Sequence, residues 1–300
     1  MAVYKKTYRP YDGPLTPSWR RLLVIPRYAF QDLHRSRFLT VFYIATFLYP
    51  LICALLIYVQ HNASALRVFN AEAAQHLISV NVVFFLSLLG WQSMLALFMA
   101  AFVGPGLVSP DLAGNALSLY LARPFSRVEY VFGKMSVLAI LLSLMTWVPG
   151  LLLFLLQGYL EGWGWMSANA RIAGGIFFGA WIWILVLALL ALALSAWVKW
   201  KPAAGALMFG VFFVAAAFGA TVDAVQRTRW GHLVQISDLI GQIWVYLFEG
   251  PNPTTNGAVF FRVTQGEELP LWCCWSALIA LCLVCLYMLA RKIRGVEVMR

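Results

Sequence analysis

Six long stretches of this chain contain no Asp, Glu, Lys, Arg or His, and they constrain the fold more than any other feature. They are residues 38–59, 77–104, 135–156, 172–198, 203–222 and 271–290. A helix needs roughly 20 apolar residues to cross the hydrocarbon core of a bilayer, and every stretch reaches that length. Buried helices of a soluble protein would rarely all do so. The sequence therefore predicts an all-α polytopic membrane protein with six transmembrane helices.

Composition agrees, since only 11% of the residues are charged against about a quarter in soluble domains. The first apolar stretch begins too late and runs too long for a cleavable signal. We expect it to be retained as a membrane helix that also directs insertion.

The basic residues predict the orientation. With the N-terminus in the cytoplasm, the inside segments carry 17 of the 22 Lys and Arg residues and the outside segments carry 5. Cytoplasmic loops of membrane proteins carry such an excess, so both termini are expected in the cytoplasm, at a bacterial inner membrane. The net charge of +10 is then a topological signal facing anionic lipid. Nothing else in the sequence supports nucleic-acid binding.

Residues 1–36 are expected to stay outside the bilayer core. The first 17 carry three prolines, one glycine and no periodicity, which indicates an irregular cytoplasmic tail. From Ser18 onwards apolar residues alternate with arginines, which fits a basic amphipathic helix lying on the membrane surface. A plain solvated basic flank is the alternative.

The loop between the second and third apolar stretches, residues 105–134, contains the clearest local signals. Gly104-Pro105-Gly106 predicts a break at the end of the second transmembrane helix. Ser109-Pro110-Asp111 then supplies an N-cap, a proline at the first helical position and an acid in the first turn. These signals predict a separate short helix that starts here.

That short helix should end near Ala122, because Arg123 precedes Pro124 and is disfavoured in the α region. Residues 126–129, Ser-Arg-Val-Glu, match a capping box that opens the third transmembrane helix. A short, separately capped helix joined rigidly to two transmembrane helices is suited to docking in a groove of a soluble partner.

The stretch from Asp111 to Lys134, DLAGNALSLYLARPFSRVEYVFGK, resembles the cytoplasmic loop of ABC-2 type transporter permeases. That family has an acid, a helix rich in small residues, Arg-Pro-x-Ser-Arg, and Gly-Lys ahead of the third transmembrane helix. The basic N-terminal helix, the six spans and the long outer segment are similar too, so the resemblance covers nearly the whole chain.

The resemblance implies that this loop contains the coupling helix that docks on a separate ABC ATPase subunit. It also implies that two six-helix chains, identical or different, pair around one translocation pathway. Residues assigned to ATPase coupling in this way are Asp111, Gly114, Leu117, Tyr120, Arg123, Pro124, Ser126, Arg127, Glu129 and Lys134. ATP and Mg²⁺ are then expected on the partner subunit, and no cofactor is expected in this chain.

The chain is not expected to be an enzyme. A phosphate-binding loop needs G-x-x-x-x-G-K-[ST], but Val128 occupies the first glycine position ahead of Gly133-Lys134. Haem or metal binding is not expected either, because the four histidines lie outside the apolar stretches and Cys282-x-x-Cys285 has no second pair. No structural disulfide is predicted.

Polar and small residues inside the apolar stretches have two interpretations each. Asn81 and Gln92 are three helical turns apart on one face of the second stretch, where they line a substrate path or form a helix–helix hydrogen bond. Gly175 and Gly179 form a GxxxG pattern in the fourth stretch. This pattern permits close approach within the bundle or at a dimer seam. The lack of ionisable residues argues against an ion-driven carrier.

The outer segment, residues 223–270, is long enough to contain structure. Its apolar residues recur on one helical face, which predicts an interfacial or re-entrant helix followed by a turn at residues 250–256. The face consists of Leu233, Ile236, Ile240, Ile243, Trp244 and Leu247. This helix either caps the exit of a pathway or packs against lipid.

Two functions remain open at this point. The first is the permease subunit of an ATP-driven ABC-2 transporter, acting as an exporter. The second is a membrane anchor that transmits motion from the same kind of ATPase to a periplasmic partner without moving substrate. The absence of ionisable residues from the apolar stretches leaves an autonomous intramembrane enzyme without candidate residues.

Overall fold

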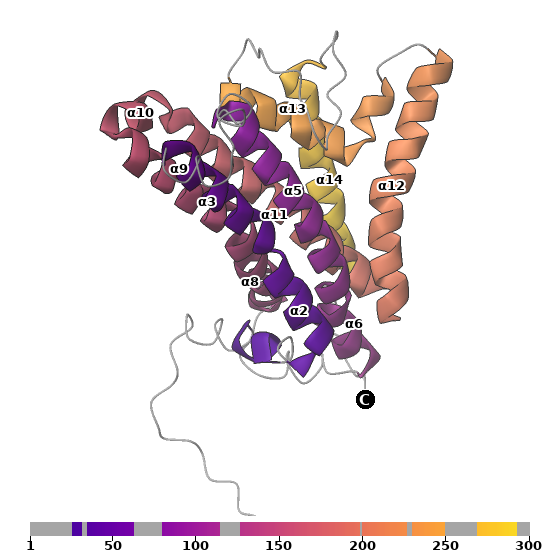
Figure 1. The fold of residues 1–300 in the computed structure, drawn as a ribbon. Helices are drawn as coiled ribbons and strands as arrows, with labels where there is room; N and C mark the ends of the chain where they lie inside the picture. The colour runs from indigo at the N-terminus through magenta and orange to yellow at the C-terminus, as the bar shows by residue number, and fades with distance from the viewer. Residues whose placement is uncertain are drawn as a thin grey trace, which may run out of the picture.

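The computed structural model of the chain describes residues 26–31, 35–62, 80–114, 127–198, 200–226, 230–249 and 269–292. Within these residues all regular secondary structure is helical, and six helices are long and apolar enough to cross a membrane (Figure 1). They are Arg37–His61, Val82–Asp111, Val128–Glu161, Ala170–Trp197, Lys201–Gln226 and Leu271–Lys292. Each overlaps one of the six apolar stretches, so the predicted all-α fold with six spans is confirmed.

The first three spans are each built from two helices. They are α2 (Arg37–Ala45) with α3 (Leu48–His61), α5 (Val82–Val103) with α6 (Pro105–Ala113), and α8 (Arg127–Met145) with α9 (Trp147–Glu161). The short α10 (Trp163–Ala168) leads into the fourth span, α11 (Ala170–Trp197). The fifth span is α12 (Lys201–Gln226), followed by the 3₁₀ turn η2 (Trp230–Leu233), by α13 (Ile236–Glu249) and by the sixth span, α14 (Leu271–Lys292).

Threonines mark two of these helix breaks. The Thr46 hydroxyl donates to the carbonyl of Tyr43 at 2.6 Å, and the Thr146 hydroxyl donates to the carbonyl of Leu142 at 2.8 Å. A hydroxyl bonded back to its own helix bends that helix. The first and third spans therefore change direction near the middle of their own length.

The central helix of the bundle is α11, which packs against α5, α6, α8, α9, α12, α13 and α14. Its sequence is apolar all around, as expected for a helix covered on every side. In its most apolar part 72% of the residues are buried, against 28% in the fifth span and 22% in the first and sixth. The outlying spans therefore present the apolar surface of the chain.

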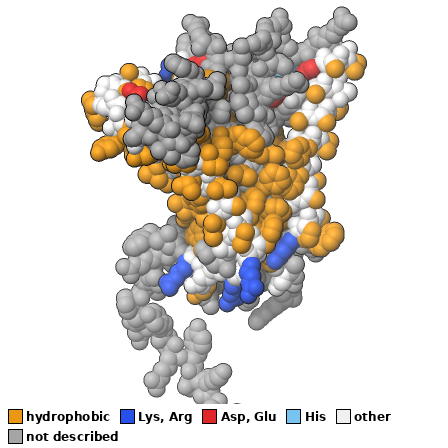
Figure 2. All heavy atoms as spheres, in the orientation of Figure 1, with side chains coloured by type: hydrophobic (Ala, Val, Ile, Leu, Met, Phe, Trp, Pro, Cys, Tyr) orange, Lys and Arg blue, Asp and Glu red, His pale blue; other side chains and the backbone are white. Residues whose placement is uncertain are grey.

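The two ends of the bundle differ in charge (Figure 2). Arg37, Lys201 and Lys292 lie where α2 begins, α12 begins and α14 ends, and we call this the basic end. Glu161 and Asp223 lie at the opposite end, called here the acidic end. The first span therefore begins at the basic end, and the last span ends there.

The second span corrects two predictions from the sequence. Gly104-Pro105-Gly106 does not end the span, because Gly104 keeps helical angles (φ −54°, ψ −47°) and its N–H still donates to the Ala100 carbonyl. Proline is tolerated in the first turn of a helix, so α6 continues directly from Pro105. Ser109, Pro110 and Asp111 therefore lie inside α6 and do not start a helix, and Asp111 is in the last turn.

Candidate functional site

The junction between α6 and the central helix is the first part of the candidate site. The hydroxyl of Ser195 on α11 accepts hydrogen bonds from the backbone N–H groups of Val108 (3.3 Å) and Ser109 (2.9 Å). It also donates to the carbonyl of Pro105 at 3.0 Å. Both serine side chains are fully buried. One hydroxyl of α11 is therefore bonded to three backbone groups of α6.

Close backbone contact on both sides holds this junction in place. A Cβ on Gly104 would lie 2.6 Å from the Cβ of Ala191 on α11. A Cβ on Gly205 of α12 would lie 2.7 Å from the carbonyl oxygen of Ala101. Pro105 has no N–H to offer that carbonyl. The glycines therefore let α11 and α12 approach the second span where it passes from α5 to α6.

An ion pair ties α6 to α8 at the basic end. Lys134 Nζ lies 2.8 Å from Asp111 Oδ2, and the two side chains are only 12% and 17% exposed. The hydroxyl of the fully buried Tyr130 donates to the same carboxylate oxygen at 2.8 Å. An acid in the last helical turn opposes the helix dipole, so the lysine and the hydroxyl compensate Asp111. This pair joins the two helices that enter and leave residues 115–126.

The structure brings together some of the coupling residues assigned from the sequence. Asp111 and Lys134 pair directly, Gly114 is the exposed cap of α6, Arg127 is the first residue of α8, and Glu129 lies in its first turn. The others are outside the described residues: Leu117, Tyr120, Arg123, Pro124 and Ser126. Their coupling role remains a prediction, as does the helix expected to end near Ala122.

Asn81 and Gln92 have separate structural roles. The Asn81 side chain caps α5 by accepting the N–H of Phe84 at 3.2 Å, so it lies at the start of the helix and not along its face. The buried Gln92 donates to the Thr46 carbonyl at 3.2 Å, across to the break in the first span. This hydrogen bond joins the second span to the first span at the break between α2 and α3.

Gly175 and Gly179 of α11 lie against the helix of the outer segment. A Cβ on Gly175 would lie 2.6 Å from the ring of Phe248, and one on Gly179 would lie 3.0 Å from the ring of Trp244. The Trp244 indole N–H also donates to the Gly179 carbonyl at 2.9 Å. The helix predicted in the outer segment is therefore α13, and within this chain the GxxxG pattern packs α13 against α11. The turn predicted at residues 250–256 lies outside the described residues.

At the acidic end, one histidine side chain lies between two carboxylates. His232 Nδ1 lies 3.0 Å from Asp238 Oδ2, and its Nε2 lies 3.5 Å from Asp223 Oδ2. Asp223 also accepts the backbone N–H of Gly231 at 2.8 Å. Burial raises the pKa of Asp238, and the contact with His232 partly offsets the rise. These contacts fasten η2 and α13 to the last turn of α12.

Ser195 and Tyr130 were not predicted from the sequence. A lone serine in the otherwise apolar stretch 172–198 is a signal for such a contact, since an isolated hydroxyl in a membrane helix often bonds to a neighbouring helix. Tyr130 offers no such signal, because tyrosine is common at membrane boundaries.

Together, the fold and this site define a helical polytopic membrane protein in which an ion pair joins the two helices that flank residues 115–126. The sequence model of one protein family, the ABC-2 family transporter proteins, matches residues 25–255, which is more than half of the chain. The chain therefore belongs to this family. The family predicted from the loop is thereby confirmed. A search of curated proteins finds no match.

Proposed function

We propose that this chain is the permease subunit of an ATP-driven ABC-2 exporter and that a separate ATPase subunit docks on the loop at its basic end. The observation that supports this most is the Asp111–Lys134 pair, which clamps α6 and α8 where residues 115–126 leave and return. A force applied to that loop would reach α11 through Ser195, which is bonded to α6. The helix that leads into residues 115–126 is thus hydrogen-bonded to the central helix.

The basic end is accordingly assigned to the cytoplasm. Support comes from the distribution of Lys and Arg, which favours the cytoplasmic side in membrane proteins. A cysteine at Gly13 should be protected from an impermeant reagent added outside cells, and a cysteine at Asn252 should react. Labelling of both positions from the same side would refute the six-span topology.

The loop arginines test the docking proposal. Replacing Arg123 and Arg127 with Glu should weaken recovery of the ATPase by a hundredfold or more, because attractive pairs at an interface become repulsive. Insertion should be unchanged in a topology reporter on the same chain. Glutamine replacements that disturb topology before assembly would show that these arginines only anchor the third span.

Catalysis is assigned to the partner. The purified chain alone should show no ATP hydrolysis, and the complex should hydrolyse ATP. Movement of a compound across vesicles during turnover would support the exporter. Turnover with no transport of any compound, but with force on a bound periplasmic partner, would instead support the mechanical transmitter.

A second permease chain is the expected neighbour of the first and fifth spans. Their exposed faces meet over α5 through a row of phenylalanine rings. Phe38 and Phe102 are 5.5 Å apart, Phe102 and Phe209 are 6.4 Å apart, and Phe209 and Phe213 are 6.2 Å apart. In a chain without native cysteines, a cysteine at Phe213 should cross-link two copies. A cysteine at Ile279, equally exposed on α14, should not.

A further inference from the structure

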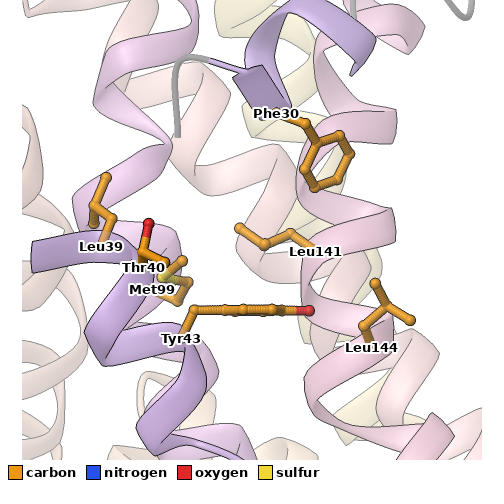
Figure 3. Close-up of a pocket in the computed structure, with 7 residues that line it drawn as sticks. All are labelled: Phe30, Leu39, Thr40, Tyr43, Met99, Leu141 and Leu144. Carbon is orange, nitrogen blue, oxygen red and sulfur yellow. The ribbon is translucent and has the colours of Figure 1, made fainter. Parts of the chain in front are cut away.

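An apolar cleft separates the first and third spans in the half of the bundle near the basic end. Its volume is about 210 Å³, and it lies between α2 and α8 (Figure 3). Met99 of α5 forms part of its wall, and Phe30 from the helical residues 26–31 lies above it. The other lining residues are Leu39, Thr40, Tyr43, Leu141 and Leu144.

The two helix breaks account for the position of this cleft. In the half near the acidic end, α3 packs directly against α9. The bends at Thr46 and Thr146 change the direction of both spans below that contact. The helices α2 and α8 therefore diverge toward the basic end, and the space between them is not filled by a side chain of either helix.

The lining accepts an apolar occupant that enters from the bilayer. Leu144 of α8 is 43% exposed, so the cleft reaches the surface of the bundle. The Thr40 hydroxyl already donates to the Ser36 carbonyl at 3.1 Å. The remaining lining is mainly aliphatic and aromatic, which suits an acyl chain.

Positive charge flanks the cleft on the side of the basic end. Arg37 precedes Thr40 by three residues in α2, and Arg27 precedes Phe30 by three residues in the helical residues 26–31. Residues three apart lie on the same side of a helix. Both arginines are exposed, and the rise of 1.5 Å per residue places Arg37 about one helical turn beyond Thr40. One exposed arginine therefore lies about one helical turn from a lining residue on each of these two helices.

We propose that this cleft binds one anionic phospholipid from the leaflet at the basic end, with an acyl chain between α2 and α8 and the phosphate at Arg27 and Arg37. The bound lipid supports the halves of the two spans at the basic end, whereas the main contact between these spans, that of α3 with α9, lies beyond their bends. The site depends on the membrane-embedded fold alone and does not require ATP-driven transport.

Native mass spectrometry of the full chain in detergent tests the site. The probes are phosphatidylglycerol and phosphatidylcholine with identical acyl chains. The wild-type chain should retain one phosphatidylglycerol at least tenfold better than phosphatidylcholine. Arg37→Gln should weaken phosphatidylglycerol binding about fivefold, the contribution of one basic residue near an anionic membrane. It should weaken phosphatidylcholine binding less, because the choline cation offsets the charge of its phosphate.

A matched pair on α8 tests the cleft itself. Leu144→Trp fills the cleft and should lower lipid retention at least tenfold. Ile140→Trp changes a residue of almost the same exposure, 40% against 43%, that does not line the cleft, and it should retain lipid like the wild type. Thr40→Phe fills the cleft from α2 and provides a second test if Leu144→Trp fails to fold. Equal retention by Leu144→Trp and Ile140→Trp would overturn the proposal, as would equal binding of the two phospholipids by the wild type.

Discussion

Removing the lysine of the Asp111–Lys134 pair is the most direct test of the clamp at the basic end. Lys134→Met keeps the length of the side chain and its apolar stem while it removes the positive charge. Among the residues that the structure describes, Asp111 then keeps the hydroxyl of Tyr130, 2.8 Å away, as its partner. A nearly buried carboxylate would thus lose the charge that compensates it in the last turn of α6.

Breaking a fully buried ion pair by removing one partner costs about 3–5 kcal/mol. Because the two side chains retain 12% and 17% exposure, some solvation persists. We therefore expect Lys134→Met to lower the free energy of unfolding by about 2–4 kcal/mol.

The assay is equilibrium unfolding in mixed micelles, with Lys201→Met as the control, since Lys201 is an exposed lysine at the same end. Adding Asp111→Asn to Lys134→Met removes the stranded charge and should restore all but about 1 kcal/mol. A loss no larger than that of Lys201→Met, or a double variant as unstable as the sum of the single ones, would refute the clamp.

Three further predictions concern the rest of the bundle. Ser195→Ala should cost about 1–2 kcal/mol of unfolding free energy, since hydrogen bonds between membrane helices average about 0.6 kcal/mol and reach about 1.7; the exposed control Ser276→Ala should change it by less than about 0.5. Gly175→Ala forces a Cβ against a ring of α13 and should cost about 1–3 kcal/mol in thermal unfolding, whereas Gly174→Ala has open space and should be neutral or stabilising. Burial raises the pKa of Asp238 above its ordinary 3.8, so its contribution to stability is present at low pH and is lost as the pH rises through the raised value. Asp238→Asn should abolish that slope in melting temperature measured from about pH 4 to pH 7.

The number of spans could be predicted because a single physical requirement, the thickness of the hydrocarbon core, fixes the length of each apolar stretch. The helix of the outer segment was predictable for a related reason. Its apolar residues recur with helical periodicity, and Ile236, Ile240, Ile243 and Trp244 are indeed buried. Both predictions depend on burial of one face or of a whole helix, which leaves a pattern along the sequence.

The boundaries of α6 were not predictable from local signals. Gly104-Pro105-Gly106 has the composition of a helix stop, and Ser109-Pro110-Asp111 has that of a helix start. Tertiary contacts override both, because Ser195 bonds to α6 from a position 86 residues away from Ser109. The ion pair has a similar explanation. The charges of Asp111 and Lys134 are visible in the sequence, but their meeting depends on how α6 and α8 pack.

The packing of α13 against the two glycines of α11 has a consequence for how the chain is made. Gly179 and Trp244 are separated by 65 residues, so α11 enters the membrane before the helix that covers its glycines has been synthesised. The face of α11 that carries Gly175 and Gly179 must contact lipid or the translocation machinery during that interval. The packing of α13 against α11 is then a late step in biogenesis. A chain truncated before Ile236 would leave the backbone of α11 at these glycines uncovered and exposed to the quality-control proteases of the membrane.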